Sequence, residues 1–159
     1  MSFETAKNHL ATLGLSHKIT VFDTSSATVS LAAKAAGCEE ARIAKSLTFD
    51  VGGETYLVVV AGDMKVNNGK FKRQFAHKAT FLTADSLEER IGHSVGGVCP
   101  FAIHNSVNVY LDISLKRFDE VLPACGSANS CVRLTISELE QASGYIDWID
   151  ICLPITSQA

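Results

Sequence analysis

Apolar and polar residues recur along the chain with two periods, one typical of helices and one typical of strands. The helical period appears in five segments, each bounded by a capping residue or a glycine. These segments are residues 3–13, residues 25–37, a segment beginning at Asn67 or Asn68, a segment capped by Asp85 or Ser86, and residues 135–144. Gly14 and Gly37 supply the stops for the first two.

Strand-like segments lie between the helices, at residues 18–23, 42–51, 55–62, the start of 79–92, 107–113 and 145–153. Gly52 and Gly53 separate two of them as the turn of a hairpin does, and a second hairpin is predicted about Gly126 over residues 122–135. Hairpins mixed with helical crossovers predict one α+β (mixed α/β) domain over residues 1–159, built on a twisted mixed sheet with flanking helices. A central hairpin disfavours a doubly wound parallel sheet.

Composition agrees with a globular protein, because 47% of the 159 residues are hydrophobic and 19% are charged. No apolar run approaches the roughly 18 residues of a membrane-spanning helix. The first residues have the pattern of a polar amphipathic helix rather than of a signal peptide. We therefore expect a cytoplasmic protein without a membrane partner.

Cysteine and histidine spacing gives no sign of a metal centre. The five cysteines are odd in number and include no CxxC pair, and the five histidines include no HxxxH or HExxH arrangement. We expect free thiols, no disulfide framework, no metal and no cofactor.

Net charge is only −3, but basic residues gather in one interval. No acidic residue lies between Asp63 and Asp85, whereas the interval holds Lys65, Lys70, Lys72, Arg73, His77 and Lys78. Such a segment can follow a phosphate backbone. A solvated helix face that lacks carboxylates explains the pattern equally well.

Lys45 departs from the alternation of its strand. Apolar residues at 43, 47, 49 and 51 share one face, and Ser46, Thr48 and Asp50 share the other, yet Lys45 has the parity of the apolar set. Either its stem reaches solvent from the strand end, or its ammonium enters a concave site and meets an anion or a polarised carbonyl.

The stretch "GHSVGGVCPFAI" interrupts an apolar run with glycines and a proline. It is either a turn or a loop whose bare main chain approaches a ligand, because glycine has no Cβ and Pro100 stiffens the exit. Gly92, Ser94 and Gly96 match G-x-S-x-G, but a helix precedes them and an apolar strand follows. That order disfavours a serine hydrolase, whose elbow needs a strand–turn–helix context.

These segments together resemble the YbaK/prolyl-tRNA synthetase-associated editing domain family. The resemblance rests on "ARIAKSLTF", "GGVCPFAI", "VYLDISL" and "ACGSANSCVRLT", and it covers nearly the whole chain. Its most specific parts are Lys45 and the GxxxP loop from Gly96 to Pro100. It implies a trans-editing deacylase that hydrolyses the ester of tRNA carrying a wrong, small near-cognate amino acid.

The resemblance also implies roles for single residues. Lys45, Gly96 and Gly97 are the candidate catalytic positions, because an activated ester needs a placed water and main-chain donors more than a nucleophile. Candidate substrate-binding positions are His93, Val98, Cys99, Pro100, Asp112, Gly126 and Ser127. Candidate tRNA-binding positions are Lys65, Lys70, Lys72, Arg73 and Lys78.

Several of these positions have simpler interpretations that the residues leave open. His93 can merely cap the preceding helix, and Gly126 with Ser127 can merely form a turn. Cys99 is interpreted as a pocket-lining residue rather than a nucleophile. Asp112 points away from the apolar face of its strand, either to solvent or into a pocket.

Two other functions compete with the deacylase. One is a non-catalytic module that binds tRNA or an aminoacyl group beside a synthetase, and the other is a hydrolase of small esters or thioesters. The expected partner is the aminoacylated 3′ end of tRNA, with an aminoacyl-tRNA synthetase as a further candidate.

Overall fold

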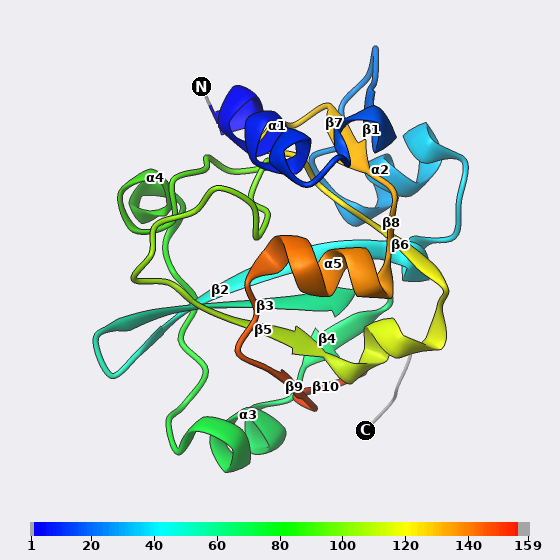
Figure 1. Cartoon of the computed structure of the whole chain (residues 1–159). Helices are drawn as coiled ribbons and strands as arrows, with labels where there is room; N and C mark the ends of the chain where they lie inside the picture. The colour runs from blue at the N-terminus through cyan, green and yellow to red at the C-terminus, as the bar shows by residue number, and fades with distance from the viewer. Residues whose placement is uncertain (1, 156–159) are drawn as a thin grey trace.

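A six-stranded mixed sheet with the strand order β8–β6–β2–β3–β5–β9 forms the centre of the fold (Figure 1). The computed structural model describes residues 2–155. The strands of this sheet are β2 (Ile43–Val51), β3 (Glu54–Ala61), β5 (Asn108–Asp112), β6 (Glu120–Pro123), β8 (Leu134–Thr135) and β9 (Asp147–Ile149). β2 and β3 form the predicted hairpin, while β2 with β6 and β3 with β5 are parallel pairs. The predicted α+β class with a mixed sheet is confirmed.

Five α-helices flank the sheet in the described part of the chain. They are α1 (Ser2–Thr12), α2 (Val29–Ala36), α3 (Asn68–Phe75), α4 (Leu87–Arg90) and α5 (Ile136–Ser143). The side chains of Thr28, Asn67 and Thr135 accept main-chain hydrogen bonds at the starts of α2, α3 and α5, as their hydroxyl and amide chemistry predicts. No helix within residues 2–155 is long and apolar enough to cross a membrane.

Three sequence-based expectations need correction. The strand expected at the start of 79–92 is a single bridge between Phe81 and Phe49, and the helix after it, α4, is one turn without a side-chain cap. The hairpin about Gly126 is reduced to the bridge Ala124–Cys131, because β7 (Ser130–Val132) pairs with β1 (Ile19–Val21) instead. The single strand expected over residues 145–153 is divided into two short strands.

That division follows from a buried carboxylate. Asp112 accepts the N–H of Ile151 at 2.9 Å, so the chain leaves the ladder after β9. It then pairs again as β10 (Cys152–Pro154) with β4 (Met64–Val66). The end of the chain thus crosses from the main sheet to a second, two-stranded sheet.

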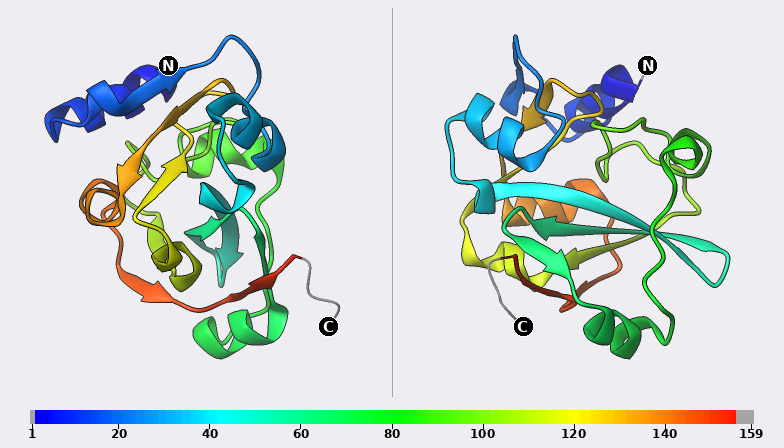
Figure 2. Two further views of the ribbon diagram at one scale, coloured as in Figure 1. Left: turned by 90° about the vertical axis from the view of Figure 1, so that its right-hand side faces the viewer. Right: turned by 180° about the vertical axis from the view of Figure 1, so that it is seen from behind.

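The two faces of the sheet are buried against different elements. Leu57 and Val59 of β3 join the core formed with α1, α4 and α5, whereas Val58 and Val60 join the core that contains Phe71 of α3. Figures 1 and 2 show α3 with β4 and β10 on one side of the sheet, and α1, α2, α4 and α5 on the other. β3 is therefore apolar from Leu57 to Ala61, as a strand segment covered on both faces must be.

Candidate functional site

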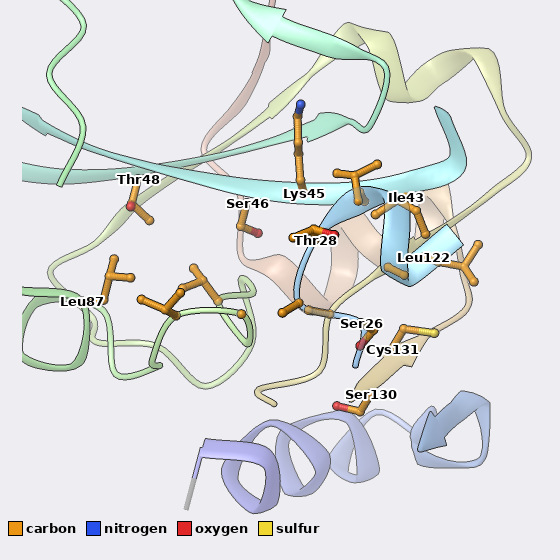
Figure 3. Close-up of a pocket in the computed structure, with 18 residues that line it drawn as sticks. Ser26, Thr28, Ile43, Lys45, Ser46, Thr48, Leu87, Leu122, Ser130 and Cys131 are labelled. Atoms are coloured by element: carbon orange, nitrogen blue, oxygen red, sulfur yellow. The ribbon is translucent and has the colours of Figure 1, made fainter. Parts of the chain in front are cut away.

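A cavity of about 200 Å³ lies beneath β2, between α2 and the loop at residues 95–98 (Figure 3). Its walls combine small apolar side chains with hydroxyl groups. The hydroxyl-bearing residues are Ser26, Thr28, Ser46, Thr48 and Ser130, and the apolar ones include Val29, Ala32, Leu87, Val98, Leu122 and Cys131. The lining therefore suits a small ligand group with both apolar and hydrogen-bonding parts.

Two of the cavity hydroxyls are buried without a hydrogen-bond partner among residues 2–155. They are the Oγ atoms of Ser26 and Ser46, and only 6% of Ser26 is exposed. A buried polar group without a partner destabilises the folded state by about 1–3 kcal/mol. Their position in the cavity wall makes these hydroxyls candidate ligand contacts.

The GxxxP loop reaches the cavity through Gly96 and Val98. The N–H of Gly97 donates to the Ser94 carbonyl at 3.1 Å and is already satisfied. A Cβ at Gly97 would lie 2.6 Å from the main chain of Gly126 and Ser127. The expectation that both glycines admit a ligand is therefore corrected for Gly97, whose missing side chain lets two loops pack against each other.

Gly126 has the same kind of explanation. Its φ is +80°, and an added Cβ would collide with the carbonyl oxygen of Ser2 at the start of α1. Ser2 Oγ also donates to the Gly126 carbonyl at 2.8 Å. Close contact between the α1 start, the Gly126 turn and the GxxxP loop thus fixes the loop that forms one cavity wall.

Lys45 shares a face with Leu47 and Phe49, as its parity predicts, but this is not the face of the cavity. Figure 3 shows its side chain leaving β2 on the side opposite to Ser46 and Thr48. Nζ lies 3.5 Å from the Gly62 carbonyl. The expectation that this ammonium and the loop at 96–100 face each other across one hollow is corrected. Lys45 is among the residues around the cavity, but its side chain leaves β2 on the opposite side, so the ammonium lies behind the strand. Burial lowers the pKa of Lys45, partly offset by Cys152 and Asp63.

His93, Cys99 and Pro100 lie away from the cavity wall. His93 and Cys99 are fully buried, with Cys99 Sγ 3.4 Å from His93 Nε2, and that Nε2 lies 2.7 Å from the Phe101 carbonyl. Pro100 lines a different cavity together with His9 and His104. The sequence-based placement of these three residues beside the substrate is therefore corrected, because the chain turns into the core directly after Val98.

Asp112 and Ser127 also contact other parts of the fold. The Asp112 carboxylate is buried and accepts the N–H groups of Ser114 and Ile151 at 3.0 and 2.9 Å, which joins β5 to the C-terminal segment. Ser127 Oγ is hydrogen-bonded to Ser130 Oγ, and Ser130 lines the cavity. Ser127 thus contacts a residue that lines the cavity but does not line it itself, and Asp112 is remote from the cavity.

The basic interval lies on α3 and its flanks, on the side of the sheet opposite to the cavity (Figure 2). Lys70 is paired with Asp150 at 2.9 Å and donates to the Cys152 carbonyl. Lys65, Lys72, Arg73 and Lys78 are exposed, and they form no ion pair within the described residues. A polyanion can therefore reach these four cations without first breaking an ion pair.

The cavity lining holds no carboxylate and no histidine among the described residues. Lys45 and Cys131 are the titratable residues that line it, and burial raises the pKa of Cys131 to about 11. Burial likewise raises the pKa of Cys99 to about 12. Neither thiol is a thiolate at neutral pH, which argues against covalent catalysis by cysteine. Among residues 2–155 no three His, Cys, Asp or Glu side chains are grouped as a metal site.

Sequence reasoning missed most of the hydroxyl groups and the apolar residues of α2. One signal was present, because Ser46 and Thr48 form a polar face on a strand that lies inside the sheet. Polar residues there indicate either solvent or a cavity. The contributions of Ser26, Ser130 and Leu122 depend on long-range packing and have no local signal.

The sequence profile of the aminoacyl-tRNA editing domain matches residues 23–142, which is most of the chain. The chain belongs to the aminoacyl-tRNA editing domain family. The resemblance inferred from the Lys45 and GxxxP segments is confirmed. All the hydroxyl-bearing residues of the cavity fall inside the matched region.

Two relatives are similar to this chain over very different shares of their own length. The uncharacterized protein YwhH of Bacillus subtilis (strain 168) is 45% identical over 96% of this chain and 98% of its own length. Proline–tRNA ligase of Lysinibacillus sphaericus (strain C3-41) is 32% identical over 48% of this chain and 14% of that enzyme.

Two solved structures have the same fold as this chain. A crystal structure described as a proposed trans-editing enzyme for prolyl tRNA synthetase superposes with a TM-score of 0.84, at 30% identity, over 94% of this chain and 96% of that one. A scaffold used for epitope backbone grafting superposes with a TM-score of 0.86 at 28% identity, over 97% and 98% of the two chains.

Proposed function

We propose that this protein is a trans-editing deacylase that hydrolyses the ester of tRNA carrying a small, wrong amino acid. The observation that carries the proposal is the cavity of about 200 Å³. Its wall combines small apolar side chains, the GxxxP loop and the two hydroxyls of Ser26 and Ser46 that have no hydrogen-bond partner among the described residues. Membership of the editing domain family and similarity to a proposed trans-editing enzyme support the same activity.

The chemistry follows from what the cavity contains. An aminoacyl ester is already activated, so water held at the carbonyl and hydrogen bonds to the developing oxyanion are sufficient for hydrolysis. The main-chain N–H groups of Gly96 and Val98 are candidate donors, because both residues line the cavity and neither N–H forms a hydrogen bond among the described residues. Gly97 acts indirectly, by holding this loop in place.

Lys45 is assigned to the tRNA and not to the ester. Its ammonium lies on the same side of the sheet as α3, where a phosphate of the 3′ end can meet it together with the exposed cations of the basic interval. Lysine binds phosphate as a point charge. This division leaves the cavity to the aminoacyl group.

The test is a deacylation screen with tRNAs charged with alanine, serine, cysteine, threonine and proline. We expect at least one small amino acid to be released much faster than by spontaneous hydrolysis. Lys45→Ala is expected to lose most of this activity, whereas Lys34→Ala, which removes an exposed lysine of α2, keeps it. Failure to accelerate any release would refute the deacylase and leave a binding module.

Salt dependence separates the deacylase from a hydrolase of small esters. Binding that neutralises several phosphates weakens steeply as salt rises, with a slope of about −0.7 per contact on single strands. We expect this slope for charged tRNA. Equal kcat/KM values for charged tRNA and for a simple alanine ester, both insensitive to salt, would favour the small-ester enzyme.

A further inference from the structure

One residue of β2 presents main-chain groups that no neighbouring strand covers. β2 is antiparallel to β3, and in such a ladder alternate residues direct N–H and C=O away from the partner. The N–H of Asp50 donates to the Thr80 carbonyl at 2.8 Å, on the side away from β3. The Thr48 carbonyl accepts from Leu82 on that same side, at 3.0 Å. Ser46 therefore faces the same way.

The neighbours on this side end before they reach Ser46. β6 pairs with β2 only at Ile43 and Ala44, and the segment at 80–82 bonds only residues 48 and 50. Between them the N–H and C=O of Ser46 form no hydrogen bond with any residue in 2–155. The hydroxyl of Ser46 is also buried without a partner. Ser46 is thus a single position whose main-chain N–H and C=O have no partner strand, and we call it the open ladder position. It lies in the wall of the cavity.

An aminoacyl group matches a single open ladder position. It carries one donor, the α-amino group, and one acceptor, the ester carbonyl, on either side of one Cα atom. Two residues that face each other as a hydrogen-bonded antiparallel pair exchange just these two bonds. We propose, on the basis of the proposed function, that the aminoacyl group binds as a one-residue strand on Ser46. Its amine donates to the Ser46 carbonyl and its ester carbonyl accepts from the Ser46 N–H.

This pairing predicts where the side chain of the amino acid goes. Side chains of directly opposed residues lie on the same face of a sheet. Ser46 points into the cavity, so the side chain of an L-amino acid enters the cavity as well (Figure 3). A D-amino acid held by the same two bonds would direct its side chain to the Lys45 face. The ladder therefore selects the L configuration.

Amide exchange in the intact, ¹⁵N-labelled protein tests the pairing directly. In the free protein the Ser46 amide should exchange faster than those of Lys45 and Leu47, which bond to β3. Saturation with the amide-linked analogue of 3′-L-alanyl-adenosine should protect the Ser46 amide and shift its resonance, while the Asp50 amide, bonded to Thr80, changes little. The D-alanyl analogue should give no protection. An unchanged Ser46 amide under saturation would overturn the proposal.

A pair of variants separates the main chain from the hydroxyl. Ser46→Pro removes the N–H at a position where that N–H has no ladder partner, and Ser46→Ala keeps the N–H. Loss of a main-chain oxyanion donor lowers kcat by about 10²–10³-fold, so we expect that loss for Ser46→Pro and less than about tenfold for Ser46→Ala. Equal activity of Ser46→Pro and wild type would contradict the proposal. If Ser46→Pro does not fold, the exchange experiment on the wild type decides.

The result also distinguishes this inference from the proposed function. A wild-type protein that releases amino acids from tRNA without any change at the Ser46 amide refutes the pairing and leaves the deacylase intact. A protein that neither releases amino acids nor binds the alanyl analogue refutes both. Protection of Ser46 by the analogue without hydrolysis of any charged tRNA supports the pairing in a binding module.

Discussion

Substitution of Gly97 by alanine separates two explanations for the double glycine. If Gly97 is bare so that a ligand can approach, an added methyl group affects activity alone. In the structure the methyl carbon would instead lie 2.6 Å from the main-chain atoms of Gly126 and Ser127. Main-chain atoms cannot rotate away, so the two loops must separate. Overpacking of this kind destabilises a protein by about 1–3 kcal/mol.

The magnitude can be compared with a matched glycine elsewhere. Gly97 is not among the glycines with positive φ, so alanine there brings a collision without backbone strain. Gly37 is the reverse case, with φ +69° and no atom within 4 Å of an added Cβ. Gly37→Ala should cost about 1–2 kcal/mol through the left-handed conformation alone. Both variants lower stability, and only Gly97→Ala moves the wall of the cavity.

Thermal unfolding, urea unfolding and deacylation, measured on the same samples, distinguish the two explanations. For a chain of this size each kcal/mol lowers Tm by about 2–4 °C, so Gly97→Ala should melt about 2–12 °C below the wild type. Its activity per folded molecule should fall, whereas that of Gly37→Ala should not. An unfolding free energy of Gly97→Ala equal to that of the wild type, together with lost activity, would refute the packing argument and restore direct ligand contact.

Three further predictions follow from charge and burial. Lys72→Ala and Arg73→Ala should each weaken tRNA binding by a similar amount for all tRNA sequences. Each variant should also reduce the slope of log affinity against log salt concentration by about one. Unchanged slopes would exclude α3 from the tRNA interface. Iodoacetamide at neutral pH should modify Cys38 before Cys131 and Cys99, with activity retained. Burial raises the pKa of all three thiols, to about 11 for Cys131 and about 12 for Cys99, but only Cys38 is partly exposed. Rapid inactivation through Cys131 would contradict this prediction. Burial lowers the pKa of His93, so the unfolded chain binds a proton near pH 6.5 that the folded chain resists. The free energy of unfolding should therefore decrease as pH falls below about 6.5, and His93→Gln should reduce that decrease in urea titrations at several pH values.

The sequence was sufficient for the elements whose signals are local. The Gly52–Gly53 hairpin, the hydroxyl-capped helix within residues 25–37 and the helices that begin near Asn67 and Thr135 were each predicted from neighbouring residues, because turns and helix starts are formed within a few positions of the chain. The segment at 145–153 was not, since its division depends on a carboxylate of β5 that is distant in sequence. Local patterns do not report such long-range contacts.

The candidate site was predicted in part for the same reason. Strand alternation placed Lys45 on the apolar face, which is where it lies. Alternation cannot tell which face of a strand carries a cavity, so the hydroxyl face of Ser46 and Thr48 was not recognised as its wall. Likewise the glycines of the GxxxP loop were identified as places of close approach, but whether a ligand or another loop approaches Gly97 depends on the position of Gly126.

The separation of Lys45 from the cavity agrees with the charges of an aminoacylated 3′ end. Such a ligand carries a positive α-amino group at its end and negative phosphates along its strand. An ammonium inside a cavity of about 200 Å³ would repel the amino group at short range, where low polarity strengthens the repulsion. Neutral hydroxyls and main-chain groups accept that amine without repulsion. Under the proposed function, with the cation behind β2 and the open ladder position of Ser46 beside the hydroxyls, each end of the ligand would meet groups of suitable charge, and β2 itself would keep the two environments apart.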